Sequence, residues 1–280
     1  MRTTLQQLTK RVAAGERLVM VTCYDYTSAR LVDRSQVDLV LVGDSLGMVM
    51  LGHESTVPVT LDDMVRAAAS VVRGSTRPLV VGDLPFLSYT TPAQALAASH
   101  RLLAEAGVQS VKLEGGTAVA PQVQALVGAG VPVMGHIGFT PQSVNQIGMR
   151  VQGREAGAAV RLVQDALALE AAGAWAVVLE LVPEQLAAEV TARLSVPTIG
   201  IGAGAGCDGQ VQVWHDMLGL YEDFVPRHTR RFRSLGAEVV AGLDEYAAAV
   251  RAGEFPTSEN TSRMEADVLA QVRSRLADGS

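Results

Sequence analysis

The sequence alternates short apolar runs with longer stretches of helical spacing, and this alternation constrains the fold more than any other feature. None of the runs alternates polar with apolar residues, as expected for parallel strands that are buried on both faces. We therefore predict eight strands, at Leu18–Cys23, Leu39–Val42, Leu79–Val81, Ser110–Leu113, Val131–Gly135, Ala176–Leu179, Thr198–Ile201 and Val211–Trp214.

The stretches between these runs contain signals for the start and end of helices. Thr60 precedes apolar residues at three- and four-residue spacing. Thr91 is followed by a proline at the first helical position and by a glutamine three residues after the cap. Gly107 and Gly173 follow two further stretches, as glycine often does at a helix C-terminus.

Eight strands that alternate with helices favour a (β/α)8 TIM barrel, which usually has about 250 residues. A doubly wound open sheet is the alternative, but it predicts a glycine-rich turn after the first strand, and this turn reads Cys23-Tyr24-Asp25-Tyr26-Thr27. We predict one α/β barrel domain over residues 1–256, with Thr4–Ala14 as an N-terminal capping helix. Residues 257–280 are predicted to form a linker and a short C-terminal helical tail.

Composition and charge argue against other classes of protein. The formal charge is −6, from 23 basic and 29 acidic residues, whereas a nucleic-acid-binding protein normally carries a basic face. No apolar stretch approaches the length that spans a bilayer, so we expect no membrane contact. Cys23 and Cys207 are far apart and form no metal-ligand pattern, which makes the reducing cytoplasm the expected location.

Polar residues stand at the ends of five consecutive predicted strands. The C-terminal ends of barrel strands share one mouth, so we expect four carboxylates, a lysine, a histidine and a serine to converge there. They are Asp44 and Ser45 after the second strand, Asp83 after the third, Lys112 and Glu114 at the fourth, His136 at the fifth and Glu180 at the sixth.

Carboxylates gathered without compensating charge repel one another and resist ionisation, and a divalent cation would resolve this. Ligands that are all oxygen suit a hard ion such as Mg²⁺. We expect Asp44 and Asp83 to bind Mg²⁺ directly, with Glu114 nearby through water. Zinc is disfavoured because the sequence has no Cys/His cluster.

Each of these residues also has a structural interpretation. Asp44 and Asp83 could cap helices or form turns, and His136 could be a buried core histidine. Lys112 and Glu114 share one face of a strand, where they could form a plain ion pair. The equivalent positions of the two aspartates favour a functional role, as does the position of Glu180 directly after an apolar run.

At these residues the sequence resembles the ketopantoate hydroxymethyltransferase family, which belongs to the phosphoenolpyruvate mutase-like barrels. The resemblance runs from about Thr4 to Pro256, and the segment Asn145–Gly153 departs from the family pattern. The matching segments are Leu41–Met48, Gly82–Phe86, Val111–Gly116, Gly135–Ser143, Leu179–Glu180 and Ile199–Gly204, with His215-Asp216 beyond.

The resemblance implies an enzyme that transfers a hydroxymethyl group from 5,10-methylenetetrahydrofolate to 3-methyl-2-oxobutanoate. The product would be 2-dehydropantoate (ketopantoate), on the route to pantothenate and coenzyme A. The keto acid and the folate would be its small-molecule partners, and Mg²⁺ its cofactor. The resemblance also implies a large homo-oligomer, commonly a decamer.

The resemblance further implies roles for individual residues. It implies Mg²⁺ at Asp44 and Asp83, with Glu114 in the outer sphere. It implies contacts to the keto acid from Asp44, Ser45, Asp83 and Lys112, with His136 nearby, and a base role for Glu180. In the mechanism that follows, Mg²⁺ stabilises the enolate, Glu180 removes the C–H proton, and the enolate carbon attacks the methylene group of the folate.

Two other functions compete with this interpretation. A relative of phosphoenolpyruvate mutase or isocitrate lyase would need a nucleophilic cysteine loop or contacts to a phosphonate, and the sequence shows neither. A barrel that has lost catalysis and serves as a scaffold would have lost one of Asp44, Asp83 or Glu180, and all three are present.

Overall fold

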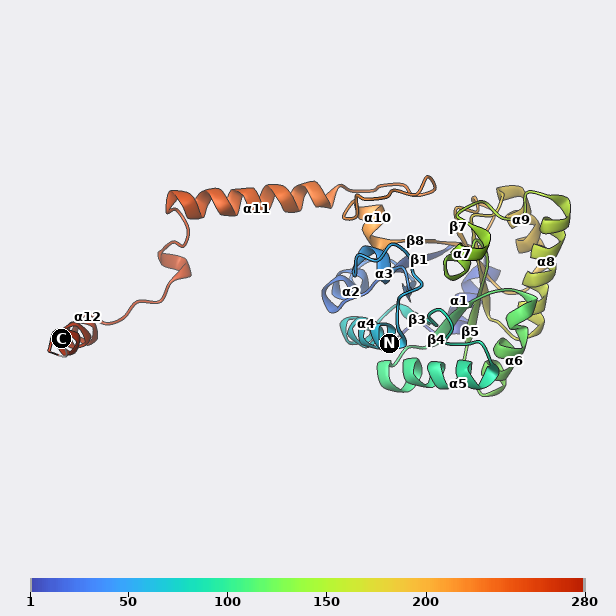
Figure 1. Ribbon diagram of the computed structural model, residues 1–280, viewed down its shortest axis with the longest axis horizontal. Helices are drawn as coiled ribbons and strands as arrows, with labels where there is room; N and C mark the ends of the chain where they lie inside the picture. Colours follow the sequence, from blue (N-terminus) through green and yellow to red (C-terminus); the bar gives the residue numbers. More distant parts are fainter. Residues whose placement is uncertain (1, 279–280) are drawn as a thin grey trace. The chain divides into compact units, whose positions relative to one another are not determined.

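Eight parallel strands close into a barrel in the computed structural model of the chain, which describes residues 2–278 (Figure 1). Each strand pairs with the next one along the chain, and the barrel closes where Leu18 lies opposite Gly209. The predicted (β/α)8 TIM barrel is therefore confirmed. Its strands are β1 (Leu18–Thr22), β2 (Leu39–Val42), β3 (Leu79–Asp83), β4 (Ser110–Glu114), β5 (Val133–Gly138), β6 (Ala176–Glu180), β7 (Thr198–Ile201) and β8 (Gly209–Gln212).

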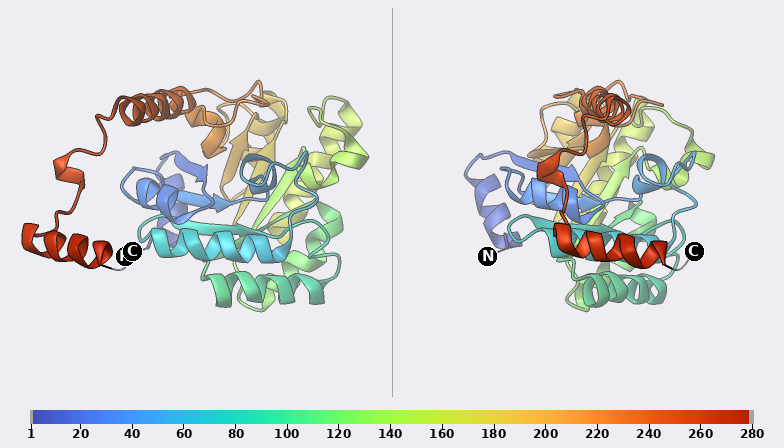
Figure 2. Two further views of the ribbon diagram at one scale, coloured as in Figure 1. Left: turned by 60° about the vertical axis from the view of Figure 1, so that its left-hand side comes forward. Right: turned by 90° about the vertical axis from the view of Figure 1, so that its left-hand side faces the viewer.

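Helices connect the strands and surround them, as the two views in Figure 2 show. The longer ones are α2 (Tyr26–Asp33), α4 (Leu61–Gly74), α5 (Pro92–His100), α6 (Ala120–Gly128), α8 (Ala156–Ala171) and α9 (Glu184–Arg193). Shorter ones are α3 (Leu46–Val49), α7 (Val144–Ile147) and α10 (Trp214–Leu218), with 3₁₀ turns at Thr117–Val119 and Pro141–Ser143.

Local sequence signals set the helix ends as expected. The Thr91 side chain accepts a hydrogen bond from the backbone N–H of Gln94, and the Gln94 side-chain oxygen accepts one from the backbone N–H of Thr91. After α5 the chain continues through a π-helical segment, Arg101–Ala106, which ends at Gly107 with a φ of 83°. Glycine adopts this left-handed conformation without steric cost, so it can end the helix there.

The helix α1 (Leu5–Ala13) covers the N-terminal end of the barrel, as predicted. Thr4 caps it and accepts a hydrogen bond from the backbone N–H of Gln7. Its one buried residue, Leu8, packs in a cluster with Leu18 and Leu39, the first residues of β1 and β2. Since strands begin at this end of the barrel, the opposite end is left open to ligands.

Alternation along the strands divides the interior of the barrel into apolar layers and a polar layer. Leu79 and Val81 of β3 pack in the interior cluster, as does Met134 of β5. Asp83 and His136 follow two residues later on the same strands, so they face the same interior. The polar residues therefore form the layer nearest the C-terminal ends of the strands.

The last strand lies two residues earlier than the sequence pattern predicted. The prediction was Val211–Trp214, but β8 is Gly209–Gln212. Trp214 instead begins α10, and its backbone N–H donates to the hydroxyl of Thr22. The prediction followed apolar residues, whereas pairing with β1 and β7 fixes the strand at Gly209, a position that carries no side chain.

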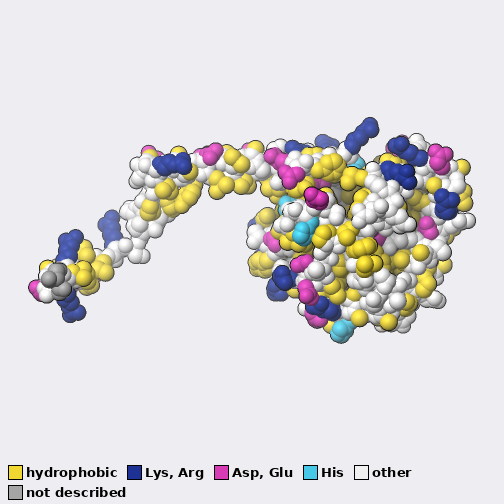
Figure 3. All heavy atoms as spheres, in the orientation of Figure 1, with side chains coloured by type: hydrophobic (Ala, Val, Ile, Leu, Met, Phe, Trp, Pro, Cys, Tyr) yellow, Lys and Arg dark blue, Asp and Glu magenta, His cyan; other side chains and the backbone are white. Residues whose placement is uncertain are grey.

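The chain from Arg233 onward forms a second compact unit. It contains α11 (Leu235–Ala252), a 3₁₀ turn at Ser258–Asn260 and α12 (Ala266–Ala277). Neither helix has a buried residue among those described, and hydrophobic side chains lie exposed along this segment (Figure 3). The two compact units divide between Phe232 and Arg233. The domain boundary expected at Pro256 stays a prediction.

Candidate active site

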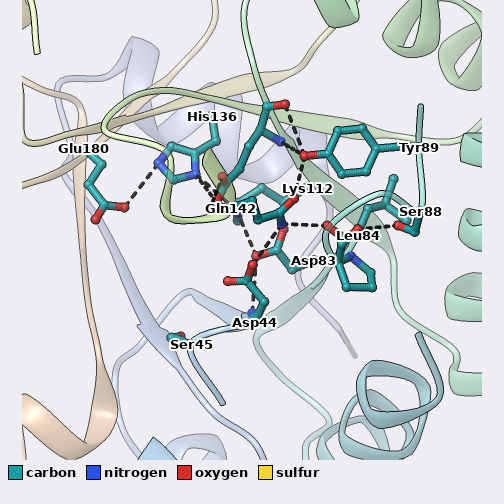
Figure 4. A network of polar contacts seen from close by, with 12 residues as sticks. Asp44, Ser45, Asp83, Leu84, Ser88, Tyr89, Lys112, His136, Gln142 and Glu180 are labelled. Carbon is teal, nitrogen blue, oxygen red and sulfur yellow. Dashed lines mark hydrogen bonds and ion pairs between the residues drawn. The ribbon is translucent and has the colours of Figure 1, made fainter. Parts of the chain in front are cut away.

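The ends of β3 to β6 bring five of the predicted residues into one polar network (Figure 4). Strand register aligns them, because Asp83 lies opposite Lys112 and Glu114 lies opposite His136. Glu180, the last residue of β6, lies opposite Gly138, two residues after His136. The other two candidates, Asp44 and Ser45, follow β2 at the same end of the barrel.

Lys112 lies at the centre of this network and is almost completely buried. Its Nζ is 2.9 Å from Asp83 Oδ2, 3.8 Å from Glu114 Oε1 and 3.2 Å from His136 Nδ1. Burial lowers the pKa of Lys112, but the charges of Asp83 and Glu114 outweigh burial and raise it above its ordinary value. The lysine is therefore a permanent cation among carboxylates.

Asp44 is connected to the network through Gln142, a residue that the sequence analysis did not assign to the site. The Gln142 side-chain amide donates to Asp44 Oδ2 at 2.9 Å, and its backbone N–H donates to Glu114 Oε2 at 3.0 Å. Tyr89 donates to Gln142 Oε1 at 2.7 Å. Gln142 lies in the segment Gly135–Ser143 that carried the family resemblance, and this was the only sequence signal for it.

Ser45 lies beside a second unassigned residue. The hydroxyl groups of Ser45 and Tyr24 are 2.9 Å apart, and the Tyr24 ring stacks on His215 with centroids 5.5 Å apart. Burial raises the pKa of Tyr24 above its ordinary value, so its hydroxyl stays protonated. Tyr24 can therefore hold the Ser45 side chain in position.

His136 connects the buried network to Glu180. Its Nε2 lies 3.2 Å from Glu180 Oε2, and its Nδ1 lies 3.5 Å from Glu114 Oε1. Burial and the Lys112 charge oppose protonation, but Glu114 and Glu180 outweigh them and raise the pKa of His136 to about 9. When the His136 ring is neutral, its Nδ1 accepts a hydrogen bond from Lys112, so the ring hydrogen is on Nε2. When the ring is charged, both nitrogens carry hydrogen. In either state Nε2 therefore presents a hydrogen toward Glu180.

The carboxylates of the network are short of positive charge and of hydrogen-bond donors. Burial and the charges of Asp83 and Glu114 raise the pKa of Asp44 well above its ordinary value. Among the described residues, Asp83 Oδ1 and Glu114 Oε1 are buried and accept no hydrogen bond. Burying polar atoms in this way costs free energy unless a partner is present, so these oxygens fit a bound cation.

With the side chains in these positions, no group of three or more His, Cys, Asp or Glu residues within 2–278 is arranged to hold a metal ion. Lys112 is one reason, since its ammonium group lies against Asp83. The Gln142 amide is another, since it occupies one oxygen of Asp44. The donor set nonetheless consists of carboxylate oxygens, which hard divalent cations prefer.

A cavity of about 1020 Å³ opens beside the network. Of the seven predicted residues, only Ser45 and Glu180 line it, and the others lie buried behind them. The cavity is lined by apolar and by charged residues. The apolar ones include Met48, Phe139, Met149 and Phe224, and the charged ones include Arg150, Arg154, Glu184, Asp216 and Arg227.

Neither cysteine can serve as the nucleophile that a phosphoenolpyruvate mutase-like or isocitrate lyase-like reaction would need. Cys23 and Cys207 are both buried, and burial raises the pKa of Cys23 to about 11. Neither lines the cavity beside Glu180. Since the thiolate is the reactive form, the structure agrees with the sequence in disfavouring this alternative.

Comparison with known proteins identifies the family. The sequence model of the family described as ketopantoate hydroxymethyltransferase matches residues 2–258. The chain belongs to the ketopantoate hydroxymethyltransferase family. It is accordingly an enzyme, a hydroxymethyl-transferring member of that family.

Individual relatives of the ketopantoate hydroxymethyltransferase family match almost the full length of the chain. The 3-methyl-2-oxobutanoate hydroxymethyltransferase of Chloroflexus aurantiacus is 60% identical over 270 residues, which cover 96% of this chain and 96% of the relative. The protein of the same name from Gluconacetobacter diazotrophicus is 55% identical over 272 residues, which cover 97% and 99%.

A solved structure shares the fold. The 2,3-dimethylmalate lyase of the PEP mutase/isocitrate lyase superfamily matches 99% of this chain and 100% of its own, with a TM-score of 0.58 and 16% identity. At this identity the likeness concerns the fold alone. No helix within residues 2–278 is both long enough and apolar enough to cross a lipid bilayer.

Proposed function

We propose that the enzyme forms 2-dehydropantoate from 3-methyl-2-oxobutanoate, 5,10-methylenetetrahydrofolate and water, and releases tetrahydrofolate. The new bond joins C3 of the keto acid to the folate methylene carbon. Water supplies the hydroxyl oxygen of the product. The C3 proton and one proton of water balance the two hydrogens that the folate nitrogens gain. This reaction would serve pantothenate and coenzyme A synthesis in the cytoplasm.

One observation carries the proposal, namely a carboxylate at the cavity wall beside a buried cluster of oxygen donors. Glu180 lines the cavity with a side chain that is 15% exposed, and His136 joins it to Lys112, Asp83 and Glu114. A general base must lie within hydrogen-bond reach of the proton that it removes from the substrate. Oxygen donors next to it suit a reaction in which negative charge develops on a substrate oxygen.

The proposed cation site consists of Asp44 and Asp83, with Glu114 nearby. Asp83 Oδ1 and Glu114 Oε1 support it, because both are buried and accept no hydrogen bond from the described residues. Burial and repulsion by Asp83 and Glu114, which raise the pKa of Asp44, support it as well. When bound there, Mg²⁺ supplies Lewis acidity that acidifies the C–H next to the keto group and stabilises the charge of the enolate. Lys112 adds a fixed positive charge at the same place.

Glu180 takes the proton from C3 of the keto acid. His136 Nε2 lies 3.2 Å from Glu180 Oε2, and the ion pair of a charged His136 with this carboxylate limits the positions that the base can adopt. Asp44, Ser45, Asp83 and Lys112 would contact the carboxylate and keto groups of the substrate. Positioning of the base and the C–H bond is worth several orders of magnitude in rate.

The size and lining of the cavity support a folate as second substrate. A volume of about 1020 Å³ is far larger than a five-carbon keto acid requires. Aromatic and apolar walls suit a flat pterin ring, and ligand sites are commonly lined in this way. Arg150, Arg154 and Arg227 line the same cavity and match the glutamate carboxylates of a folate in charge.

A direct assay tests the function. The purified protein is incubated with 3-methyl-2-oxobutanoate, Mg²⁺ and 5,10-methylenetetrahydrofolate, and ketopantoate is measured by mass spectrometry. We expect product only when all three are present, and none after removal of divalent cations. Cleavage of a carbon–phosphorus bond or of a 2-alkylmalate, with no ketopantoate, would instead indicate a phosphoenolpyruvate mutase-like enzyme. No reaction of either kind would indicate a scaffold protein.

A further inference from the structure

A second carboxylate lies in the same cavity as Glu180, and the reaction proposed above gives it no role. Asp216, in the first turn of α10, lines the cavity and is only 6% exposed. Within residues 2–278 its carboxylate has no hydrogen bond and no ion pair of the kind that holds Asp83. Burial raises the pKa of Asp216 to about 6, although the charge of Arg231 acts in the opposite direction.

This lack of partners distinguishes Asp216 from carboxylates that stabilise the fold. Asp33, for comparison, accepts hydrogen bonds from the backbone N–H groups of Thr76 and Arg77, both at 2.7 Å. A carboxylate that is buried without donors costs free energy in the folded protein. A ligand that supplies the missing donors would remove this cost, so Asp216 is suited to binding.

Gln212 contributes a second unpaired acceptor to the same wall. It is the last residue of β8, lies four positions before Asp216 and lines the cavity. Its Oε1 is buried, and none of the described residues donates a hydrogen bond to it. Two acceptors without donors line one cavity, and they call for a ligand that carries several N–H groups.

We propose that Asp216 binds the pyrimidine edge of the pterin ring of the folate, and that Gln212 accepts a further hydrogen bond from this ring. This inference rests on the proposed function, because it takes a reduced folate as the second substrate. The pterin edge presents N3–H and the 2-amino group side by side, and a carboxylate accepts two such donors in a bidentate arrangement. Phe139 and Phe224 line the same cavity and supply apolar surface for the ring faces.

The keto acid does not fit this position. It carries no N–H donor, and its own carboxylate would be repelled by Asp216. The keto acid is better matched in charge to Lys112 and the proposed cation site. The inference therefore makes Asp216 a specificity-determining residue for the folate.

Binding of two ligands to the full-length protein tests this assignment without catalysis. The first is tetrahydrofolate, and the second is an analogue in which hydrogen replaces the 2-amino group; both affinities are measured by titration calorimetry. We expect Asp216→Asn to weaken tetrahydrofolate binding by about 10- to 100-fold, the range for a lost hydrogen bond to a charged group. The wild type should prefer tetrahydrofolate to the analogue, and Asp216→Asn should lose most of this preference.

Two further variants serve as controls. Glu189→Gln changes an exposed carboxylate of α9 that does not line the cavity, and we expect it to bind both ligands as the wild type does. Gln212→Leu removes the second acceptor, and we expect a smaller loss, about 3- to 10-fold. Because Asp216 lacks partners in the protein, Asp216→Asn should unfold at or above the wild-type temperature.

The outcomes separate this inference from the proposed function. If the wild type forms ketopantoate but Asp216→Asn binds tetrahydrofolate normally, the inference is wrong and the function stands. The same holds if the variant keeps the full preference for the 2-amino group, or if it loses only stability. If the wild type neither binds tetrahydrofolate nor forms ketopantoate, the proposed function itself fails.

Discussion

Three buried carboxylates and one buried lysine give the centre of this barrel an excess of negative charge. The Lys112 ammonium neutralises part of this charge by pairing with Asp83 at 2.9 Å. His136 neutralises another part by pairing with Glu114. Burial and repulsion still raise the pKa of Asp44. A divalent cation is therefore the natural complement of the network, and individual substitutions can test this.

Asp83→Asn removes the charge of one proposed metal ligand while it keeps the size of the side chain. We expect the Mg²⁺ concentration for half-maximal activity to rise about 10- to 100-fold, because an interaction with a charged group contributes about 1.5–3 kcal/mol. The fold should persist, since Lys112 keeps Glu114 and His136 as neighbours. Mg²⁺ titration and circular dichroism check both points, with Asp267→Asn on α12 as the control. Full activity with unchanged Mg²⁺ dependence would contradict the proposed ligand.

Glu180→Gln separates the two halves of the proposed reaction. Without folate, the wild type should exchange the C3 hydrogen of 3-methyl-2-oxobutanoate with deuterium from solvent. The glutamine variant keeps the shape of the site but lacks the proton acceptor, so exchange and turnover should both fall about 10²- to 10⁴-fold. Nuclear magnetic resonance of the keto acid measures the exchange. Exchange at the wild-type rate would mean that the base lies elsewhere.

At the scale of elements, the strands that end at Asp83 and Glu180 could be predicted because each of these residues follows a run of mostly apolar residues, and Lys112 could be placed inside a short strand between Val111 and Leu113. The inward direction of their side chains follows from the alternation along each strand. The position of β8 could not be predicted in this way, because its pairing depends on Gly209 meeting Leu18 across the closure of the barrel. Such contacts join residues far apart in the sequence.

The places of Gln142 and Asp216 in the site could not be predicted for a related reason. Neither residue follows an apolar run as Glu180 does. Gln142 lies in the 3₁₀ turn after β5, and Asp216 lies in the first turn of α10 after β8. Gln142 meets Asp44 and Glu114 only because the segment after β5 folds over the barrel end. Sequence patterns record the period of a helix or strand, whereas they do not record where a turn directs a side chain.

The capping box of α5 permits a stability test at the element scale. Thr91→Ala removes the acceptor for the backbone N–H of Gln94, and loss of such a cap costs about 1 kcal/mol. We expect a lower midpoint in thermal or urea unfolding with unchanged keto-acid binding. Thr9→Ala is the matched control, since Thr9 is exposed within α1 and alanine is the better helix former. Equal stability of the two variants would show that the cap contributes nothing.

At the scale of the whole molecule, the second compact unit points to association between copies of the chain. Val239, Leu243, Tyr246 and Val250 recur at three- or four-residue spacing on one face of α11, and all are exposed. Exposed apolar surface of this kind commonly marks an interface. The homo-oligomer, its decameric form and the cytoplasmic location stay predictions.

Leu243→Asp tests whether this apolar face joins subunits. A charge in a hydrophobic interface is costly to bury, so we expect a smaller assembly in analytical ultracentrifugation. Ala248→Asp introduces the same charge on the opposite side of α11 and should leave the assembly unchanged. If Leu243→Asp sediments as the wild type does, the face has another partner or none.

Removal of the residues after Pro256 tests which part of the chain catalysis requires. All proposed site residues lie between Tyr24 and Arg227, and the family match ends at residue 258. The deleted segment contains α12, which has no buried residue among those described, so its loss exposes no core of the barrel. We therefore expect kcat and KM close to the wild-type values, even if the assembly changes. A truncated protein that stays folded and oligomeric but loses turnover would place part of the active site in the tail, since neither unfolding nor dissociation could then explain the loss.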